Sequence, residues 1–488
     1  MSSSASTEWN VGVDIGGTFT DIVFVGNDGD VFRRKVLSTP PDYSAAIREA
    51  LTVIFQDQKI AASSVRRFVH GTTIATNAIL EERGAITALI TTEGFRDVLE
   101  FRRLRVPELY NFLYERPAPL IPRRRRFEVS ERLDARGKVL ERLDLDSVKR
   151  AVQRVKESGA RALAIALLHS YTNPAHEHRV EKIARRMLGP DVFICCSADI
   201  LPEIREYERT STAVINAYIG PVVHEYVSAM QKMLHQLGVP APLQIMQSSG
   251  GVLGVAAVLA KPAYIVESGP AAGVIGGAEL ARRAAIGNVI TIDMGGTTAK
   301  ASMVEQGRVT KTSEYEVGAG INISSHLTKG RGHALKLSVI DVSEIGAGGG
   351  SLATVDETGR LKVGPQSAGA DPGPVCYGRG GEIPTLADAM VVLGYVNPTR
   401  IAGGAVAIDA ARSRSAIERL IAKPMKKSVL DAAYGIFVLA GTTMTRAVKA
   451  VSTFRGRDPR DFALVAFGGN GPVMAAQIAD ELQQRKIV

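Results

Sequence analysis

Two segments of the chain share a pattern of residues that could bind a polyphosphate. Residues 11–36 read VGVDIGGTFTDIVFVGNDGDVFRRKV, and residues 289–313 read VITIDMGGTTAKASMVEQGRVTKTS. In each segment an apolar run ends in an aspartate, Asp14 or Asp293, and Gly-Gly-Thr follows after one more residue. Such a turn between two strands directs backbone N–H groups and a hydroxyl to one point, and glycine lets the backbone approach a phosphate closely. The aspartate at the strand end can hold Mg²⁺, directly or through water.

The repetition strengthens this interpretation. One such turn is typical of a plain β-hairpin, whereas two related halves could clamp a polyphosphate between them. A third glycine-rich turn, residues 468–471, follows an apolar run and opens a predicted helix. There the backbone could lie flat against an adenosine. We therefore predict a nucleotide site, with three purely structural turns as the alternative.

The segments between these turns predict the elements that position them. Helical patterns cover residues 43–57, 74–82, 145–158, 203–237, 271–284, 410–420, 429–453 and 473–482, and strand patterns cover residues 67–70, 85–91, 162–169, 243–246 and 462–467. This alternation around a duplicated unit predicts an α/β protein of two related halves. We place one domain at residues 1–195 and a second at residues 196–488. Residues 102–145, rich in Pro and Arg, are interpreted as an excursion from the first core.

Composition restricts the class of protein. Hydrophobic residues make up 45% and charged residues 22%, which excludes wholesale disorder, collagen and coiled coil. The net charge of +9 is diffuse apart from four arginines at residues 123–126, interpreted as a solvated loop, so we expect no nucleic-acid partner. Three cysteines without a Cys-x-x-Cys pattern predict a reducing compartment. No signal peptide and no apolar run of about 18–20 residues is found, so we expect a cytoplasmic protein without membrane contact.

A few polar residues near the turns are candidates for contact with a substrate. His70 ends a predicted strand just before Gly-Thr-Thr and could point into the cleft together with Thr72, although a hydrogen-bonded structural histidine has the same pattern. Asp341 and Glu344 lead into glycine-rich residues 346–351, which could form a wall of the site or simply a loop that needs glycine.

Other reactive residues are expected to be structural. His176 and His178 lie two residues apart, a spacing that does not place them on one helix face, so we expect no metal there. Cys376 has no clearly adjacent base, which argues against a nucleophile.

Longer stretches carry a resemblance to a known family. They are VGVDIGGTFTDIV, HGTTIATNAILEERGA, LITTEGFRDVLE, SSGG, ESGPAAGVIGGA, DMGGTTAKAS, IGAGGGS, VGPQSAGADPGPVCYGRGG and FGGNGP, and they cover nearly the whole chain. In content and order they resemble the hydantoinase A/5-oxoprolinase family, which includes N-methylhydantoinase A and the large subunits of ATP-dependent ketone carboxylases. The resemblance implies the fold of the actin/sugar kinase/Hsp70 ATPase superfamily, two ribonuclease H-like halves with a nucleotide cleft between them.

The resemblance also implies roles for the residues of the turns. Asp14 and Asp293 would face the Mg²⁺ of ATP and act in catalysis. The first phosphate loop would comprise Gly16, Gly17, Thr18 and Thr20, the second Gly295, Gly296, Thr297 and Thr298, and the adenosine loop Gly468, Gly469 and Gly471. The family reaction uses ATP to phosphorylate an amide or enol oxygen, and catalysis is then mostly positioning and charge neutralisation.

The implied function is an ATP-dependent hydrolase subunit that opens a cyclic amide ring, such as hydantoin, N-methylhydantoin or a 5-oxoproline-like ring, with a hydantoinase B-like partner. A subunit of a ketone carboxylase of the acetone or acetophenone type is an alternative, as is a truncated, inactive relative. A non-catalytic, nucleotide-dependent assembly protein is a third class. The match beyond the nucleotide loops argues against that third class.

The chain departs from the family pattern at two places. Many oxoprolinase-like members continue the second loop as Thr-Asp, as the first loop does here at Thr20-Asp21, but this chain has Ala299-Lys300. Lys300 could contact a phosphate or could point away from it on an alternating strand. Relatives also run on well beyond the FGGNGP stretch, so we expect the family's C-terminal region to be lacking here, and a separate chain could supply it.

Overall fold

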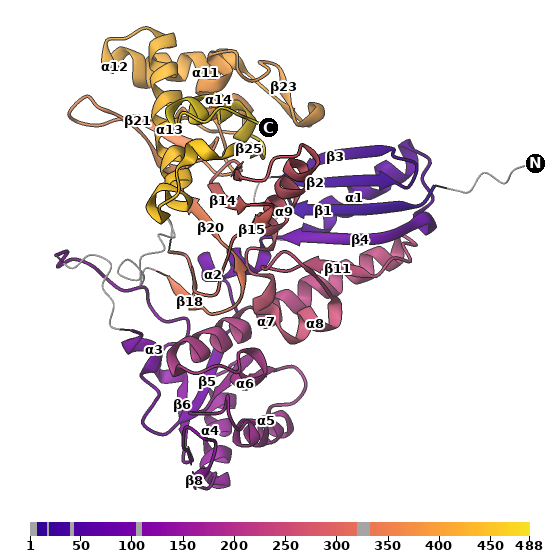
Figure 1. The fold of residues 1–488 in the computed structure, drawn as a ribbon, viewed down its shortest axis with the longest axis vertical. Coiled ribbons are helices and arrows are strands. Elements are labelled where there is room, and N and C mark those ends of the chain that lie inside the picture. Colours follow the sequence, from indigo (N-terminus) through magenta and orange to yellow (C-terminus); the bar gives the residue numbers. More distant parts are fainter. Residues whose placement is uncertain (1–6, 17–18, 40–42, 104–109, 320–331) are drawn as a thin grey trace, which may run out of the picture.

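The computed structural model describes residues 7–16, 19–39, 43–103, 110–319 and 332–488. Figure 1 shows two sheets that lie on either side of helix α9 (Ser268–Arg283), and a third sheet in a lobe below them. The first two sheets carry the predicted nucleotide turns.

The first sheet has six strands in the order β12-β11-β4-β1-β2-β3. They are β1 (Trp9–Ile15), β2 (Phe19–Gly26), β3 (Val31–Leu37), β4 (Val65–Thr72), β11 (Leu243–Met246) and β12 (Val252–Gly254). Residues of β1 are alternately buried and exposed, as the period of two in a strand with one covered face requires. Its apolar residues share one core with helices α1 (Tyr43–Asp57) and α7 (Glu206–Gln236).

The second sheet repeats this arrangement. Its order is β15-β14-β13-β25, with β20 paired to β14. The strands are β13 (Val289–Met294), β14 (Ala299–Glu305), β15 (Arg308–Val309), β20 (Val342–Ile345) and β25 (Ala463–Phe467). In each sheet the first strand of the repeat, β1 or β13, pairs antiparallel with the next strand of the chain. It also pairs parallel with a strand that follows a helix: β4 after α1 in the first sheet, and β25 after α13 (Val429–Val451) in the second. The predicted α/β fold of two ribonuclease H-like halves is therefore confirmed.

Helix α9 connects the two sheets. It covers one face of the second sheet, while α10 (Leu386–Val392), α13 and α14 (Gly471–Glu481) cover the other. It also contacts β4 and β11 of the first sheet. Any change in the angle between the sheets must therefore involve α9.

The third sheet is parallel, in the order β10-β9-β5-β6. Its strands are β5 (Thr87–Thr92), β6 (Arg126–Val129), β9 (Ala162–Ala166) and β10 (Phe193–Cys196). Helices α4 (Leu145–Glu157) and α5 (Ala175–Leu188) cover one face and α7 covers the other. Because both faces are covered, β5 and β9 are buried at every residue.

The interpretation of residues 102–145 as an excursion with a solvated arginine loop is wrong for part of this segment. Arg126 begins β6, which pairs with β5, and its side chain is fully buried. Its Nε–H donates to the carbonyl of Ile121 at 2.9 Å, and its Nη2 lies 3.2 Å from the carboxylate of Glu100. A backbone carbonyl inside the lobe therefore binds the guanidinium of Arg126, although the run of four arginines looks uniformly hydrophilic in the sequence.

The first sheet takes β11 and β12 from beyond residue 195, so the chain returns to its N-terminal part after completing the third sheet. The division into residues 1–195 and 196–488 stays a prediction.

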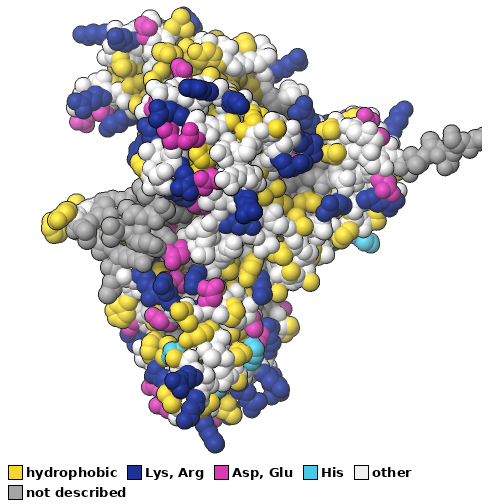
Figure 2. Space-filling model, viewed as in Figure 1, with side chains coloured by type: hydrophobic (Ala, Val, Ile, Leu, Met, Phe, Trp, Pro, Cys, Tyr) yellow, Lys and Arg dark blue, Asp and Glu magenta, His cyan; other side chains and the backbone are white. Residues whose placement is uncertain are grey.

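The surface agrees with the diffuse charge of the sequence. Figure 2 shows Lys and Arg side chains mixed with Asp and Glu over the face it presents. Across the described ranges, no single helix has the length and apolar character to cross a membrane, although one bent pair, Ala410–Met425 with Val429–Arg455, meets those criteria by length and composition alone.

Replacing Arg126 by serine should destabilise the lobe of the third sheet. The change removes the donor to the carbonyl of Ile121 and leaves a cavity, so we expect the free energy of unfolding to fall by about 2–4 kcal/mol in a denaturant titration. Arg124→Ser is the matched control, because Arg124 is exposed and a change within about 0.5 kcal/mol is expected there. Equal stability of the two variants would mean that Arg126 belongs to a solvated loop after all.

Candidate active site

Asp14 and Asp293 occupy equivalent places in the two sheets. Each is the penultimate residue of its strand, β1 or β13. The turn after each strand closes in the same way: the N–H of Gly16 donates to the carbonyl of Phe19 at 2.9 Å, and the corresponding bond of the second turn, from Gly295, measures 3.1 Å. The duplicated sequence thus folds into duplicated turns.

The two carboxylates lie close enough for their charges to interact. Part of Asp14 reaches solvent, but the surrounding protein removes water from its carboxylate. This loss of hydration raises the pKa of Asp14 to about 6, and the negative charges of Asp293 and Asp21 add to the effect. Dehydration also raises the pKa of Asp293, while the charges of Lys300 and Lys35 act in the opposite direction. Aspartates from distant parts of the chain therefore converge on one place. Carboxylate oxygens are among the donors that Mg²⁺ prefers, so these residues fit a divalent cation.

Close backbone packing beside Asp14 produces this convergence. A Cβ added to Gly269, at the start of α9, would lie 3.2 Å from the Asp14 carboxylate, and one added to Gly71, at the end of β4, would lie 2.9 Å from it. Neither position has room for a side chain. Ser268 fixes this contact, because its hydroxyl donates to the carbonyl of Thr72 at 2.7 Å and accepts from the N–H of Thr72 at 3.2 Å.

The glycine-rich loop at residues 346–351 packs against the second phosphate turn. The N–H of Gly349 donates to the carbonyl of Gly295 at 3.1 Å, and that of Gly350 donates to Gly296 at 2.6 Å. The loop therefore supports the turn through backbone contacts.

The predicted adenosine turn packs against the same place. The N–H of Asn470 donates to the carbonyl of Met294 at 2.9 Å, and its Nδ2 donates to Gly295 at 3.0 Å. Gly468 has φ +83°, and a Cβ there would clash with the carboxylate of Asp293. Gly469 is exposed, and a Cβ there would meet no protein atom within 4 Å. The second turn, the glycine-rich loop and the adenosine turn thus form one assembly around Asp293.

Lys300 points toward this assembly. It stands opposite Asp293 in the pairing of β13 with β14, at the place where the first sheet has Asp21 opposite Asp14. Its Nζ lies 3.2 Å from Glu267 and 3.6 Å from Glu344, and only 13% of its side chain is exposed. Burial disfavours the charge of Lys300, but these two carboxylates outweigh burial and raise its pKa. Lys300 therefore stays a cation beside Asp293.

Glu267 is held in an unusual backbone conformation. It has φ 61° and ψ 25°, the left-handed region, and is 4% exposed. Its N–H donates to the hydroxyl of Thr76 at 2.9 Å, and its carboxylate bonds to Lys300 and Tyr315. A strained, buried residue that cannot relax is often part of a functional site. Sequence reasoning missed Glu267 and Tyr315, whereas it named Glu344 as part of a possible wall of the site, and Glu344 lies 3.6 Å from Lys300.

Several residues predicted to bind nucleotide or substrate have structural roles or lie elsewhere. Gly17 and Thr18 fall outside the described residues. Thr20 is fully buried, and its hydroxyl lies 3.0 Å from that of Ser38, which donates to the carbonyl of Gly16 at 2.8 Å. Thr20 thus supports the first turn from inside the protein.

His70 is a buried structural histidine. Its Nδ1–H donates to the carbonyl of Val13 at 3.2 Å, and its Nε2 accepts from the hydroxyl of Tyr226 at 2.6 Å. Burial lowers its pKa to about 4, so the ring is neutral at pH 7. With no exposed surface it cannot touch a substrate, and we leave it out of the site.

Thr72 and Asp341 are also committed to the protein. Thr72 is 1% exposed, and its hydroxyl accepts from the N–H of Ile74 at 3.2 Å. Asp341 is 6% exposed and forms an ion pair with Arg455, whose Nη2 lies 3.1 Å from Oδ1. We therefore do not carry either residue forward as a substrate contact.

Replacing Lys300 by glutamine should destabilise the protein strongly. The change leaves the carboxylates of Glu267 and Glu344 buried without a counter-charge, and we expect a loss of about 3–5 kcal/mol in the free energy of unfolding. Adding Glu267→Gln should restore part of that loss. As a control, Lys35→Gln breaks the more exposed pair with Asp21 and should cost less than about 1 kcal/mol. A Lys300→Gln protein as stable as the wild type would rule out a charged network here.

Comparison with known proteins gives the family. The hydantoinase/oxoprolinase N-terminal region matches residues 10–188, and hydantoinase/oxoprolinase matches residues 209–488. An uncharacterized protein of Methanocaldococcus jannaschii is 40% identical over 98% of this chain and 70% of its own length. The caprolactamase subunit alpha of Pseudomonas jessenii is 35% identical over 99% of this chain and 68% of its own length.

Two solved structures share the whole fold. The ATP-dependent caprolactamase from Pseudomonas jessenii superimposes with a TM-score of 0.83 at 35% identity, over 98% of this chain and 68% of that one. A nucleotide-free acetone carboxylase superimposes with a TM-score of 0.84 at 28% identity, over 99% of this chain and 68% of that one. On its sequence and its fold, the chain belongs to the hydantoinase/oxoprolinase family.

Proposed function

We propose that the chain is an ATP-dependent subunit that binds Mg-ATP between its first two sheets and uses it to open a cyclic amide. The observation that carries this proposal is the convergence of Asp14 and Asp293 from duplicated strand–turn–strand units. Burial, followed by the charges of Asp293 and Asp21, raises the pKa of Asp14, and a cation beside these carboxylates would offset that cost. ATP is the ligand that brings a divalent cation together with a polyphosphate.

The residues around the aspartates suit the parts of such a ligand. The second turn, Gly295 to Thr298, and its neighbours would hold phosphates with backbone N–H groups, and the exposed turn at Gly469 would lie against the adenosine. Lys300, held by Glu267 and Glu344, keeps a buried cation on the side of Asp293, and we propose that it contributes to the charge balance around a transferring phosphoryl group. When bound, Mg-ATP supplies the phosphoryl group that turns an amide oxygen into a leaving group.

The relatives support a cyclic amide as the substrate class. A caprolactamase acts, by its name, on a lactam, and both its sequence and its structure match this chain. A ketone is the second candidate, because acetone carboxylase shares the fold equally well. Release of phosphate from ATP in the presence of caprolactam, hydantoin or 5-oxoproline would favour the amide, and release that requires acetone or acetophenone with bicarbonate would favour the ketone. A protein that binds no ATP would instead fit an inactive relative.

We also propose that a second subunit is required for ring opening. The matched caprolactamase chain is a subunit alpha, and this chain spans 68% of its length. A hydantoinase B-like chain is the partner that this reasoning favours. Because both aspartates and the adenosine turn come from this chain, Mg-ATP binding should not need the partner.

Replacing either aspartate should weaken Mg-ATP binding. We expect Asp14→Asn and Asp293→Asn each to raise the Kd at pH 7.5 by at least about tenfold, as measured by titration calorimetry, because each removes one cation ligand. The wild type should also lose affinity as the pH falls through about 6, since Asp14 becomes protonated there and loses its charge.

Asp14→Asn should lack this additional loss, and the titration of ATP itself is common to both proteins. Asp30→Asn, at an exposed turn, serves as the control and should bind like the wild type. Unchanged affinity in both site variants would place the nucleotide elsewhere.

Gly469→Ala offers a test of the adenosine turn that does not disturb the protein. Its Cβ would meet no protein atom, so the melting temperature should not change, while the Kd for Mg-ATP should rise by about tenfold if adenosine lies against this residue. Gly254→Ala, on the edge strand β12, has equally open surroundings and is the matched control. If both variants bind Mg-ATP like the wild type, adenosine does not contact this turn.

A further inference from the structure

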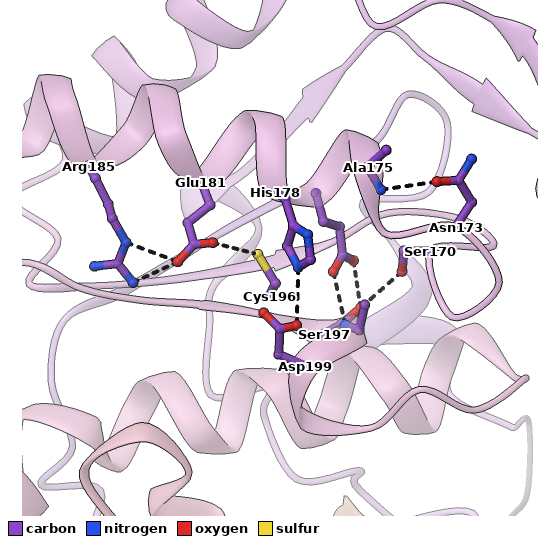
Figure 3. A network of polar contacts seen from close by, with 11 residues as sticks. Ser170, Asn173, Ala175, His178, Glu181, Arg185, Cys196, Ser197 and Asp199 are labelled. Atoms are coloured by element: carbon purple, nitrogen blue, oxygen red, sulfur yellow. Dashed lines mark hydrogen bonds and ion pairs between the residues drawn. The ribbon is translucent and has the colours of Figure 1, made fainter. Parts of the chain in front are cut away.

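The lobe of the third sheet holds a cluster of potential metal ligands that the proposed nucleotide site does not use. Figure 3 shows it: Glu181 and His178 on α5, Cys196 at the end of β10, and Asp199 on the short helix α6 (Ser197–Ile200). Figure 1 places these elements in the lower lobe, away from β1 and β14. The cluster therefore needs an explanation independent of ATP.

The ligand atoms of the cluster are already close together. The Sγ of Cys196 lies 3.7 Å from Oε2 of Glu181, and the ligand atoms of Glu181, Cys196 and Asp199 all lie within 4.8 Å of one another. Around a tetrahedral zinc ion, ligand atoms at about 2.0–2.3 Å from the metal are about 3.5 Å apart. Small rotations of exposed Asp199 and partly exposed Glu181 would bring the atoms to that spacing.

The surroundings hold these side chains in place. Oε1 of Glu181 accepts from Nε and Nη2 of Arg185, at 2.9 and 2.7 Å, which leaves Oε2 facing the thiol. His178 lies 3.1 Å from Oδ1 of Asp199 and orients that carboxylate. Contacts of this kind, one step removed from the metal, are typical of metal ligands.

The buried carboxylate of Glu177 fixes the backbone between Cys196 and Asp199. It accepts from the hydroxyl of Ser197 at 2.6 Å and from the N–H of Ala198 at 2.9 Å, so both ligands on this segment are presented from a rigid base.

The three proposed ligands border one hollow and range from buried Cys196 to exposed Asp199. Glu181, Cys196 and Asp199 line a hollow of about 840 Å³. Cys196 lines this hollow although almost all of its own surface is buried. The donor set combines a sulfur with carboxylate oxygens, which is a mixture that zinc accepts and that magnesium and calcium do not.

We propose that Glu181, Cys196 and Asp199 bind a zinc ion, with His178 orienting Asp199 and the fourth position of the metal open to the hollow. On binding, the S–H bond of Cys196 breaks, its proton passes to solvent and a bond between sulfur and zinc forms, with no change of oxidation state. The His176–His178 pair, judged from spacing alone, does not form a site, because His176 bonds instead to Glu131 at 2.7 Å. The ligands come together only through the contact of α5 with β10 and α6.

Cobalt provides a direct test because a cobalt–thiolate bond absorbs in the near ultraviolet. The full chain is stripped with a chelator and then titrated with Co²⁺ in the presence of excess Mg²⁺, which occupies carboxylate sites such as Asp14. We expect a thiolate-to-cobalt charge-transfer band that saturates at one ion per chain and disappears when Zn²⁺ is added. Failure of the band to appear at millimolar Co²⁺ would overturn the proposal.

Three variants decide which residues are responsible. Cys196→Ser should abolish the band, and Asp199→Asn should weaken Co²⁺ binding by at least about tenfold. Cys195→Ser is the matched control, since the neighbouring thiol faces the carbonyl of Ala213 at 3.5 Å, and its band should match the wild type. A band that persists in Cys196→Ser would overturn the proposal. If Cys196→Ser does not fold by circular dichroism, the exposed Asp199 decides alone, and unchanged affinity of Asp199→Asn would count against the site.

Discussion

Two carboxylates of like charge, Asp14 and Asp293, are kept near each other where the first two sheets meet, and much of the surrounding structure opposes their repulsion. Glycine at positions 71 and 269 lets β4 and α9 close around Asp14. The buried cation Lys300 lies on the other side. Burial, followed by the charges of Asp293 and Asp21, raises the pKa of Asp14, so keeping this group ionised costs free energy in the absence of a cation. A ligand that brings positive charge to this place recovers that free energy, which is a reason for the fold to tolerate the repulsion.

The internal duplication is symmetrical in backbone but not in charge. The register that sets Asp21 opposite Asp14 in the first sheet sets Lys300 opposite Asp293 in the second. On the first side Asp21 pairs with Lys35, whereas on the second side Lys300 pairs with Glu267 and Glu344, so the two halves neutralise their charges in different ways. Lys300 in turn depends on Glu267, whose left-handed backbone is held by Thr76 and by the start of α9.

The sequence predicted the parts of this arrangement that depend on local pattern. The duplicated Asp-x-Gly-Gly-Thr units, the alternation of strands and helices and the two-half fold could be predicted because each rests on residue spacing. Burial could not be predicted in the same way. His70 and Asp341 carry the groups of a substrate site, yet Tyr226 and Arg455 occupy them in three dimensions. Arg126 resembles its exposed neighbours in sequence and differs only because the carbonyl of Ile121 is within its reach. Partners that lie far along the chain leave no periodic signal.

The origin of β11 has a consequence for how the protein is made. β4 pairs on one edge with β1, but its other edge is covered only by β11, which follows the entire third sheet in the sequence. During synthesis on the ribosome, the N-terminal strands must wait for the whole lower lobe and α7 to emerge before their sheet is complete. An unpaired strand edge exposed for that time invites pairing with other nascent chains. The lower lobe has all four of its strands much earlier. An interval of aggregation risk, set by translation speed, therefore lasts until residue 246 has left the exit tunnel, and a second one lasts from the emergence of β13 until that of its parallel partner β25.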